Sequence, residues 1–228
     1  MRQVQAKYSC HRGFMVRRLH PYRSAFALIV VFILALFPVH ASAQSGNVVP
    51  VLEEFIVEVM NGKADELRGL YIPGVLADVV VSQPDGELTY VSPQKDAVTQ
   101  FVLASRYDSI GLLAHNYLAG GDFFLLEAGQ EIHLVYGDGR IETYVIRQFM
   151  RYQALIPEST ISDFVDLETG EYLSSSQLFL KIFNRPGDVV LQTCIYAEGE
   201  ASWGRLFIVA EPHKEHEPIS MPVFLEFQ

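Results

Sequence analysis

The chain has 228 residues, half of them hydrophobic, and a formal net charge of −10 at pH 7. This length suits one domain with a substantial apolar core. The acidic balance repels nucleic acid and anionic lipid headgroups, so neither is an expected partner.

The first 43 residues have the layout of a secretory signal peptide. Residues 1–24 carry six basic side chains and no acidic one, residues 25–39 are an almost unbroken apolar run, and residues 41–43 read Ala-Ser-Ala, which a signal peptidase accepts. At about 1.5 Å of helix rise per residue, the apolar run covers only about 22 Å of a hydrocarbon core roughly 30 Å thick. We therefore expect export with cleavage after Ala43. An uncleaved segment that tethers the protein at the cell surface is the alternative.

Cleavage would change both the charge and the cysteine count. Residues 44–228 keep all 27 acidic residues and 17 − 6 = 11 basic ones, a formal charge of 11 − 27 = −16, which favours solubility outside the cell. They keep one cysteine, Cys194, because Cys10 leaves with the signal. Exported proteins commonly pair their cysteines as disulfides. A solitary Cys194 is therefore an inert buried thiol, a link to another chain or a nucleophile.

Short strands dominate the pattern after the signal. Residues 44–70 form an N-terminal segment in which the apolar residues of 51–60 suggest a short helix. Residues 132–136 and 141–146 alternate or are β-branched on either side of the turn residues 137–140. This arrangement predicts a β-hairpin.

The second half of the chain predicts one helix and two further strands. A capping-box pattern that starts at Ser174 precedes the apolar residues 178–183 and favours a short helix. Residues 188–193 and 205–210 are predicted strands, with a loop at 198–204 between them. Short strands separated by Gly, Pro and Asp turns indicate an all-β fold with short helices, arranged as a small closed or nearly closed barrel.

Three reactive or charged side chains lie at the ends of predicted strands. His115 follows the apolar residues 110–114, Cys194 ends the first strand of the later pair, and Arg205 opens the second. The cysteine comes 194 − 115 = 79 residues after the histidine, and the arginine 205 − 194 = 11 residues after the cysteine. This order and spacing resembles the sortases, the exported cysteine transpeptidases of bacterial surfaces.

The residues around the cysteine carry most of the resemblance. The sortase nucleophile motif is Thr-Leu-x-Thr-Cys, and this chain matches it at Leu191, Thr193 and Cys194. It departs from the motif at Val190, where the first threonine is usual. It also has Ala114 in place of the glycine that usually precedes the histidine.

The resemblance implies a fold and the location of a site. The Ile-Pro pair at 72–73 is similar to the one that opens the sortase barrel, and residues 121–132 are similar to the Phe-x-x-Leu and Gly-Asp-x-Ile stretch after the sortase histidine. The resemblance implies an eight-stranded sortase-like β-barrel over residues 71–211, followed by a tail at 212–228. The site would lie at the mouth of the barrel, where the strand ends meet. Residues 150–188 would shape the groove for a sorting signal.

The chemistry of thioester transfer gives each of the three side chains a role. The Cys194 thiolate would attack the scissile peptide carbonyl, His115 would protonate the departing amine, and Arg205 would donate hydrogen bonds to the oxyanion. An amine acceptor at the cell surface, or water, would then release the acyl group. The expected substrates are exported proteins with a C-terminal sorting motif, and no cofactor is expected.

Three neighbouring side chains are further candidates for contacts with the substrate. Thr193 is polar and precedes Cys194, Asn116 is polar and follows His115, and Trp203 lies shortly before Arg205. A purely structural role is the alternative for each of them.

Other interpretations stay open. His115 could be a hydrogen-bonded barrel histidine, Arg205 an ordinary surface ion-pair former, and the whole chain an inactive sortase-like barrel that serves as a secreted binding or scaffold module. Other exported cysteine enzymes fit poorly, because their Gly-Cys-x-Arg motif or their cysteine-before-histidine order is missing here. His133, His213 and His216 could bind a metal, but no third ligand is evident beside the pair in the tail, so no metal site is expected.

Overall fold

The computed structural model of the chain describes residues 49–213. The signal peptide predicted over residues 1–43, with Cys10, and the tail from residue 214 onward lie outside the described residues. Within the described range, no helix combines the length and the apolar character needed to cross a membrane.

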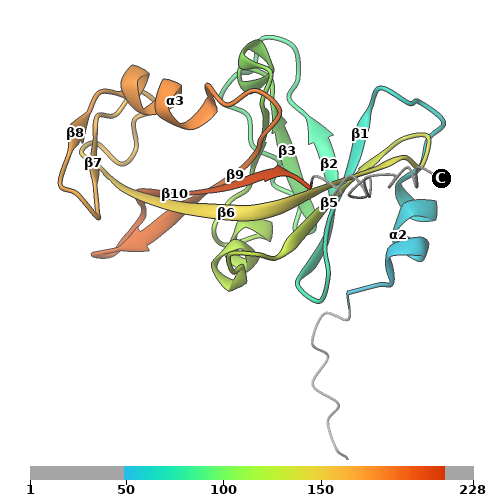
Figure 1. Cartoon of the computed structure of the whole chain (residues 1–228). Helices are drawn as coiled ribbons and strands as arrows, with labels where there is room; N and C mark the ends of the chain where they lie inside the picture. The colour runs from blue at the N-terminus through green and yellow to red at the C-terminus, as the bar shows by residue number, and fades with distance from the viewer. Residues whose placement is uncertain (1–48, 214–228) are drawn as a thin grey trace, which may run out of the picture. The chain divides into compact units, whose positions relative to one another are not determined.

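Eight strands close into a barrel (Figure 1). In barrel order they are β10 (Glu200–Pro212), β9 (Val189–Ala197), β4 (Ile110–Leu113), β3 (Ala97–Phe101), β2 (Leu76–Ser82), β1 (Leu67–Ile72), β5 (Glu131–Tyr136) and β6 (Ile141–Ala154). β6 pairs back onto β10 and completes the ring. The β2–β3 and β4–β9 pairs are parallel, and the other pairs are antiparallel. The predicted eight-stranded β-barrel with few short helices is therefore confirmed.

Two short strands and a helix extend outward from the barrel beyond β6. β7 (Phe164–Asp166) pairs with β6, β8 (Tyr172–Leu173) pairs with β7, and α3 (Ser175–Phe183) follows. The predicted capping box is present at the start of α3. The Ser174 hydroxyl accepts from the Gln177 backbone N–H, and the Gln177 side chain accepts from the Ser174 backbone N–H.

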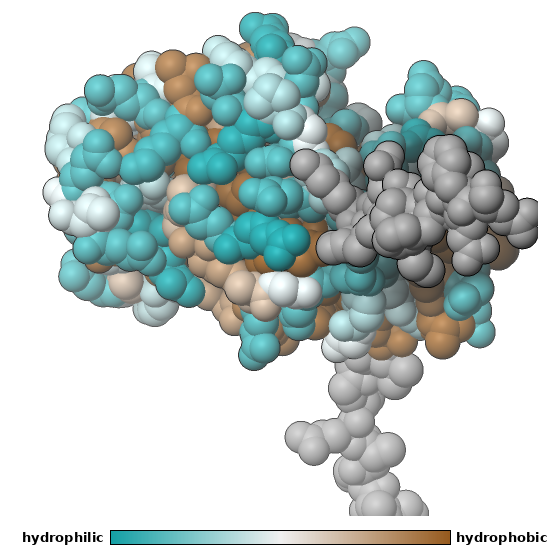
Figure 2. All heavy atoms as spheres, in the orientation of Figure 1, coloured by the Kyte–Doolittle hydropathy of each residue, from teal (hydrophilic) through white to brown (hydrophobic). Residues whose placement is uncertain are grey.

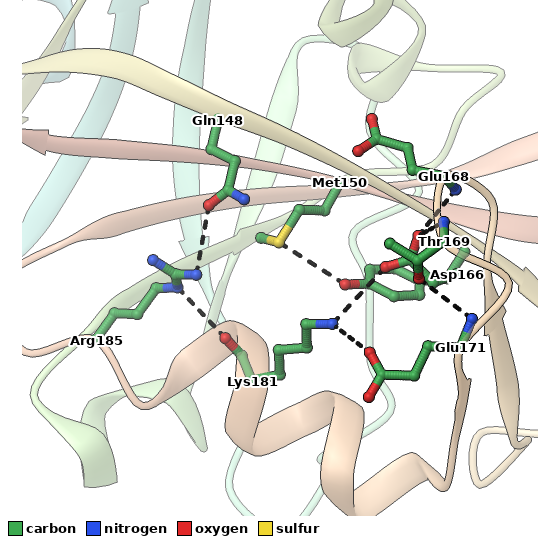
Figure 3. Close-up of polar contacts among 9 residues, drawn as sticks. Gln148, Met150, Asp166, Glu168, Thr169, Glu171, Lys181 and Arg185 are labelled. Atoms are coloured by element: carbon green, nitrogen blue, oxygen red, sulfur yellow. Dashed lines mark hydrogen bonds and ion pairs between the residues drawn. The ribbon is translucent and has the colours of Figure 1, made fainter.

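Polar contacts hold the C-terminal half of α3 in place (Figure 3). Lys181 contacts the carboxylates of Glu171 at 2.9 Å and Asp166 at 3.7 Å. The hydrogen bond to Glu171 raises the pKa of Lys181, so the ammonium group stays charged at neutral pH. Arg185 donates to the backbone carbonyl of Lys181 and to the side chain of Gln148 on β6. The helix is thus tied to the β7–β8 turn and to the barrel, in a part of the molecule whose visible surface is mostly hydrophilic (Figure 2).

The side chains of β9 and β10 alternate between two apolar cores. Leu191 and Ile208 point into the barrel, in a core to which all eight strands contribute. Val190 and Phe207 point outward and pack under α3. Because both faces are covered, these strands lack the polar alternation of a half-exposed strand.

A second helix covers another part of the outer wall. The helix predicted within residues 51–60 is present as α2 (Leu52–Val59), whose Phe55 packs on Tyr71 of β1 and Val135 of β5. Gly69 permits this close approach, because a Cβ atom there would lie 2.7 Å from the Phe55 ring. The sequence predicts where the helix is but not which strands it covers.

The connection between β9 and β10 differs from the predicted loop at 198–204. Only Glu198 and Gly199 form the turn, and both have positive φ, 54° and 82°. Such a two-residue turn matches the twist of a hairpin, so β10 begins already at Glu200, with irregular pairing as far as Gly204. The polar residues after the turn belong to a strand.

Two shorter helical turns complete the fold. They are η1 (Ala104–Tyr107), which precedes β4, and η2 (Ala119–Leu125), which follows it. Ala119 and Phe123 of η2 belong to the barrel core, so this turn helps to close the barrel interior near the end of β4.

Candidate active site

Cys194 and Arg205 face each other across the β9–β10 hairpin. They are paired residues in the antiparallel register, flanked by the pair Thr193 and Leu206. Leu206 lies in the barrel core, and neighbouring residues of a strand point to opposite faces. Cys194 and Arg205 therefore point outward, on the side of Phe207 and α3. The site lies against the outer wall of the barrel, beside the end of β4.

The register of β4 and β9 brings His115 to the same level. These strands are parallel, and each pair has a constant offset, for example Leu113 with Gln192, where 192 − 113 = 79. The last bond of this ladder runs from the Ala114 N–H to the Gln192 carbonyl at 3.0 Å. Extended two residues past the end of β4, the same offset places His115 beside Cys194, and both residues line one cavity. The spacing of 79 residues between histidine and cysteine is thus the register of two neighbouring strands.

All three side chains line one cavity of about 300 Å³. Adjacent strands lie about 4.8 Å apart, so three residues on one level span about 10 Å from the first Cα to the last. His115, Cys194 and Arg205 are each partly exposed, as groups that meet a substrate must be. The structure therefore brings together the three residues predicted to be catalytic.

The rest of the cavity wall is neutral and mostly apolar. Aromatic and aliphatic side chains come from α3, β3, β7, β10 and the segment before β3: Phe101, Phe164, Leu178, Phe179, Ile182, Phe183, Phe207, Leu88 and Val91. Ser159 and Thr160 add hydroxyl groups from the β6–β7 loop. Residues 150–188, predicted to shape the groove, supply much of this lining. Apart from Arg205, no lining residue is a carboxylate, a lysine or an arginine.

Backbone carbonyls hold the Arg205 guanidinium. Nη1 donates to the carbonyls of Ser202 at 2.8 Å and Gly204 at 2.9 Å, and Nη2 donates to that of Pro157 at 3.3 Å. Arg205 takes part in no ion pair within residues 49–213, which argues against an ordinary surface ion-pair former. A guanidinium has five N–H donors. Two of them, on Nε and Nη2, are left for a substrate oxygen.

The loop after β4 orients His115 through its backbone and its ring face. The His115 carbonyl accepts from the N–H groups of Leu118 at 2.9 Å and Gly120 at 3.0 Å. Its ring stacks on Tyr117, with centroids 5.1 Å apart and an interplanar angle of 20°. Among the described residues, no side chain hydrogen-bonds to the ring, so the ring nitrogens are available to a substrate. The stacking partner Tyr117 and the glycine at 120 were not singled out by the sequence, although both follow the histidine directly.

The three candidate substrate-binding residues have different surroundings. Thr193 borders the cavity, but its side chain is 2% exposed and faces inward, where its Oγ1 has no hydrogen-bond partner. Asn116 donates from Nδ2 to the Ala201 carbonyl at 2.9 Å and so joins the histidine loop to β10. Trp203 is half-buried, its Nε1 has no partner, and it does not line the cavity. Their contact with a substrate stays a prediction.

Together these features define a β-barrel with a cysteine, a histidine and an arginine on one level of its outer wall. The solved structures to which this chain is similar are sortases. No protein-family model and no curated protein sequence matches the chain.

Three of these structures illustrate the similarity. Sortase C from Clostridium perfringens is 13% identical with a TM-score of 0.40, over 72% of this chain and 83% of that one. Sortase A of Listeria monocytogenes is 14% identical with a TM-score of 0.38, over 65% and 87%. Sortase C1 from Streptococcus suis is 12% identical with a TM-score of 0.42, over 89% and 90%. At these values no activity can be transferred, and the site stands on the geometry of this chain.

Proposed function

We propose that this protein is a sortase-like cysteine transpeptidase. The observation that carries the proposal is that His115, Cys194 and Arg205 line one cavity, with Cys194 and Arg205 paired across β9 and β10. Cys194 is the one cysteine of the described residues, and it is unpaired. A thiol, a proton-transferring imidazole and an uncompensated guanidinium are the groups that peptide cleavage through a thioester requires.

The reaction begins when the Cys194 sulfur attacks the carbonyl carbon of the scissile peptide bond. The free N–H groups of Arg205 donate to the oxyanion of the tetrahedral intermediate. His115 then gives a proton to the leaving nitrogen, the C–N bond breaks, and a thioester to Cys194 remains. An incoming amine attacks the thioester carbonyl and passes a proton to His115. The C–S bond then breaks, and the Cys194 thiolate leaves as the new amide forms. Water in place of the amine gives hydrolysis.

The proposed substrates are exported proteins with a C-terminal sorting motif, and the proposed acceptor is an amine at the cell surface. The neutral, apolar cavity wall suits the uncharged, partly aliphatic part of such a motif. A surface location follows from the signal sequence predicted over residues 1–43. The proposal includes cleavage of this segment after Ala43, with its retention as an anchor as the alternative.

A transfer assay with a peptide library tests the proposal. Fluorogenic peptides are incubated with the purified protein and with hydroxylamine as the amine, and the hydroxamate products are identified by mass spectrometry. We expect one family of peptides to be converted by the wild-type protein and none by Cys194→Ala.

Alkylation of the thiol separates the enzyme from an inactive scaffold. In a working site, iodoacetamide modifies Cys194 with a pH dependence that changes in His115→Ala. An unreactive thiol, together with no hydroxamate from any peptide, would favour the binding module over the enzyme.

A further inference from the structure

The connection between β2 and β3 forms part of the wall of the cavity. It has to return from the end of β2 to the start of β3, because these two strands are parallel. Residues 83–96, a stretch of 96 − 82 = 14 residues, contain no helix or strand of their own. Loops of this length are uncommon in compact domains and usually have a function. Leu88, Thr89 and Val91 of this connection line the cavity.

A buried glutamine fixes this connection to the barrel. The Gln83 side chain is 5% exposed. Its Nε2 donates to the carbonyls of Leu88 and Tyr90, both at 3.0 Å. Its Oε1 accepts from the Val102 N–H, just past β3, at 3.0 Å. A side-chain amide has two N–H donors and one carbonyl acceptor, so Gln83 uses all of them to join the loop to both strands.

Two further hydrogen bonds hold the connection on either side of the cavity lining. The Tyr90 N–H donates to the Glu87 carbonyl at 3.0 Å. The Ser92 N–H donates to the hydroxyl of Thr99 on β3, at 2.8 Å, and the Thr99 side chain is fully buried. The backbone around Leu88 is therefore fixed, and the position of the Leu88 side chain at the cavity follows from it.

The stability of the barrel does not explain the leucine at this position. The Leu88 side chain is 45% exposed and belongs to none of the three core clusters formed by the described residues. An apolar side chain gains free energy in proportion to the area that is removed from water. A ligand with an apolar group in the cavity would remove such area from Leu88.

We infer that Leu88 is a specificity-determining residue of the proposed transpeptidase and that Gln83 positions it. The inference rests on the proposed function, because it concerns which peptides the proposed site accepts. Leu88 contacts an apolar side chain of the bound motif, in the cavity that Phe179 of α3 also lines. Gln83 does not line the cavity, so it acts only through the loop that it holds.

Alkylation of Cys194 with iodoacetamides of increasing N-alkyl length tests the inference without requiring turnover. The rates with N-butyl and N-octyl iodoacetamide are each divided by the rate with iodoacetamide, so that differences in thiol reactivity cancel. We expect this ratio to rise with chain length in the wild-type protein, because the alkyl chain enters the apolar cavity. In Leu88→Ala the ratio for the octyl reagent should fall by at least about threefold, because contact area is lost.

Leu180 provides a matched control for Leu88. Its side chain is also 45% exposed, and it lies on α3 without lining the cavity. Leu180→Ala should therefore keep the wild-type ratio for both reagents.

Gln83→Met tests the positioning role. It keeps the approximate length of the side chain but leaves two buried carbonyls and one N–H without their partner. The loosened loop should lower the octyl ratio as Leu88→Ala does. Gln130→Met is the control, because the Gln130 Oε1 accepts from the Glu127 N–H at 2.8 Å in a turn that does not line the cavity. Circular dichroism checks the fold, and the milder Gln83→Asn replaces Gln83→Met if the latter does not fold.

Three results would overturn the inference. They are a wild-type ratio that does not change with chain length, an unchanged ratio in Leu88→Ala, and an unchanged ratio in a folded Gln83 variant. The hydroxamate assay separates this inference from the proposed function. Transfer by the wild-type protein with unchanged ratios in the variants refutes only the inference. Lowered ratios without transfer to hydroxylamine from any peptide refute the transpeptidase and leave Leu88 as a ligand-binding residue.

Discussion

The two faces of the β9–β10 pair are filled in opposite ways. On the inner face, Leu191 and Ile208 are fully buried in the barrel core. On the outer face, Cys194 and Arg205 border a cavity under α3. The inward-facing and outward-facing side chains belong to the same two strands, because side chains alternate along a strand. The hydrogen-bonded ladder that stabilises the barrel therefore also fixes the distances between the site residues. Mutations on the two faces should separate the effect on stability from the effect on catalysis.

The largest contrast is expected between Leu191→Ala and Cys194→Ala. Loss of the buried leucine leaves a cavity in the core and should lower the free energy of unfolding by about 2–5 kcal/mol. Loss of the partly exposed sulfur should change it by less than about 1 kcal/mol and abolish transfer. Urea denaturation and the hydroxamate assay measure both quantities. If Cys194→Ala destabilises the protein as much as Leu191→Ala does, the thiol is a packing residue.

Arg205→Lys tests the outer face alone. A lysine keeps the charge but lacks the planar set of donors that contacts three carbonyls and still reaches a substrate oxygen. We expect kcat/KM to fall about 100-fold, with the free energy of unfolding changed by less than about 1 kcal/mol. Arg151→Lys, at an exposed position of β6 opposite Leu206, is the control. Equal activity in the two variants would remove Arg205 from the mechanism.

The barrel and the three site residues could be predicted because they leave local marks in the sequence. Alternating strands, turn residues and the Leu-x-Thr-Cys match lie within short windows. The face of the barrel wall that carries the site could not be predicted, because a shift of one residue in register exchanges the outward-facing and inward-facing side chains. The strand at 200–204 was predicted as part of a loop, because the sequence does not show that the turn between β9 and β10 has only two residues. The carbonyls that hold Arg205 have no sequence signal, because every residue has one.

Asp78 is an exception on the inner face. It alternates with Leu76 and Val80 of the core, is 5% exposed, and has an Oδ2 with no hydrogen-bond partner. Burial, together with the charges of Asp96 and Asp122, raises the pKa of Asp78 to about 7. An aspartate in the unfolded chain ionises near pH 3.9. The contribution of Asp78 to stability is therefore complete below about pH 4 and is lost as the pH rises to about 7.

Asp78→Asn should remove this dependence. The free energy of unfolding of the variant, relative to wild type, should rise by roughly 2–4 kcal/mol between pH 4 and pH 8. Chemical denaturation at several pH values measures the difference, with the exposed Asp85→Asn as control. A difference that is constant with pH would mean that Asp78 is ionised in the folded protein.

The smallest effect is expected at Thr193, where the two faces meet. Its hydroxyl is buried without a partner, and a Cβ atom at Gly120 would lie 2.3 Å from it. Thr193→Val keeps the shape and removes the unsatisfied group, so the free energy of unfolding should stay constant or rise by up to about 1 kcal/mol. Thr193→Ser, which keeps the hydroxyl and loses the methyl group, should be less stable than Thr193→Val. Since the side chain faces away from Cys194, the transfer rate of Thr193→Val should stay within about fivefold of wild type. A larger fall at unchanged stability would show that the hydroxyl turns to the substrate during the reaction, and that position 193 serves both faces.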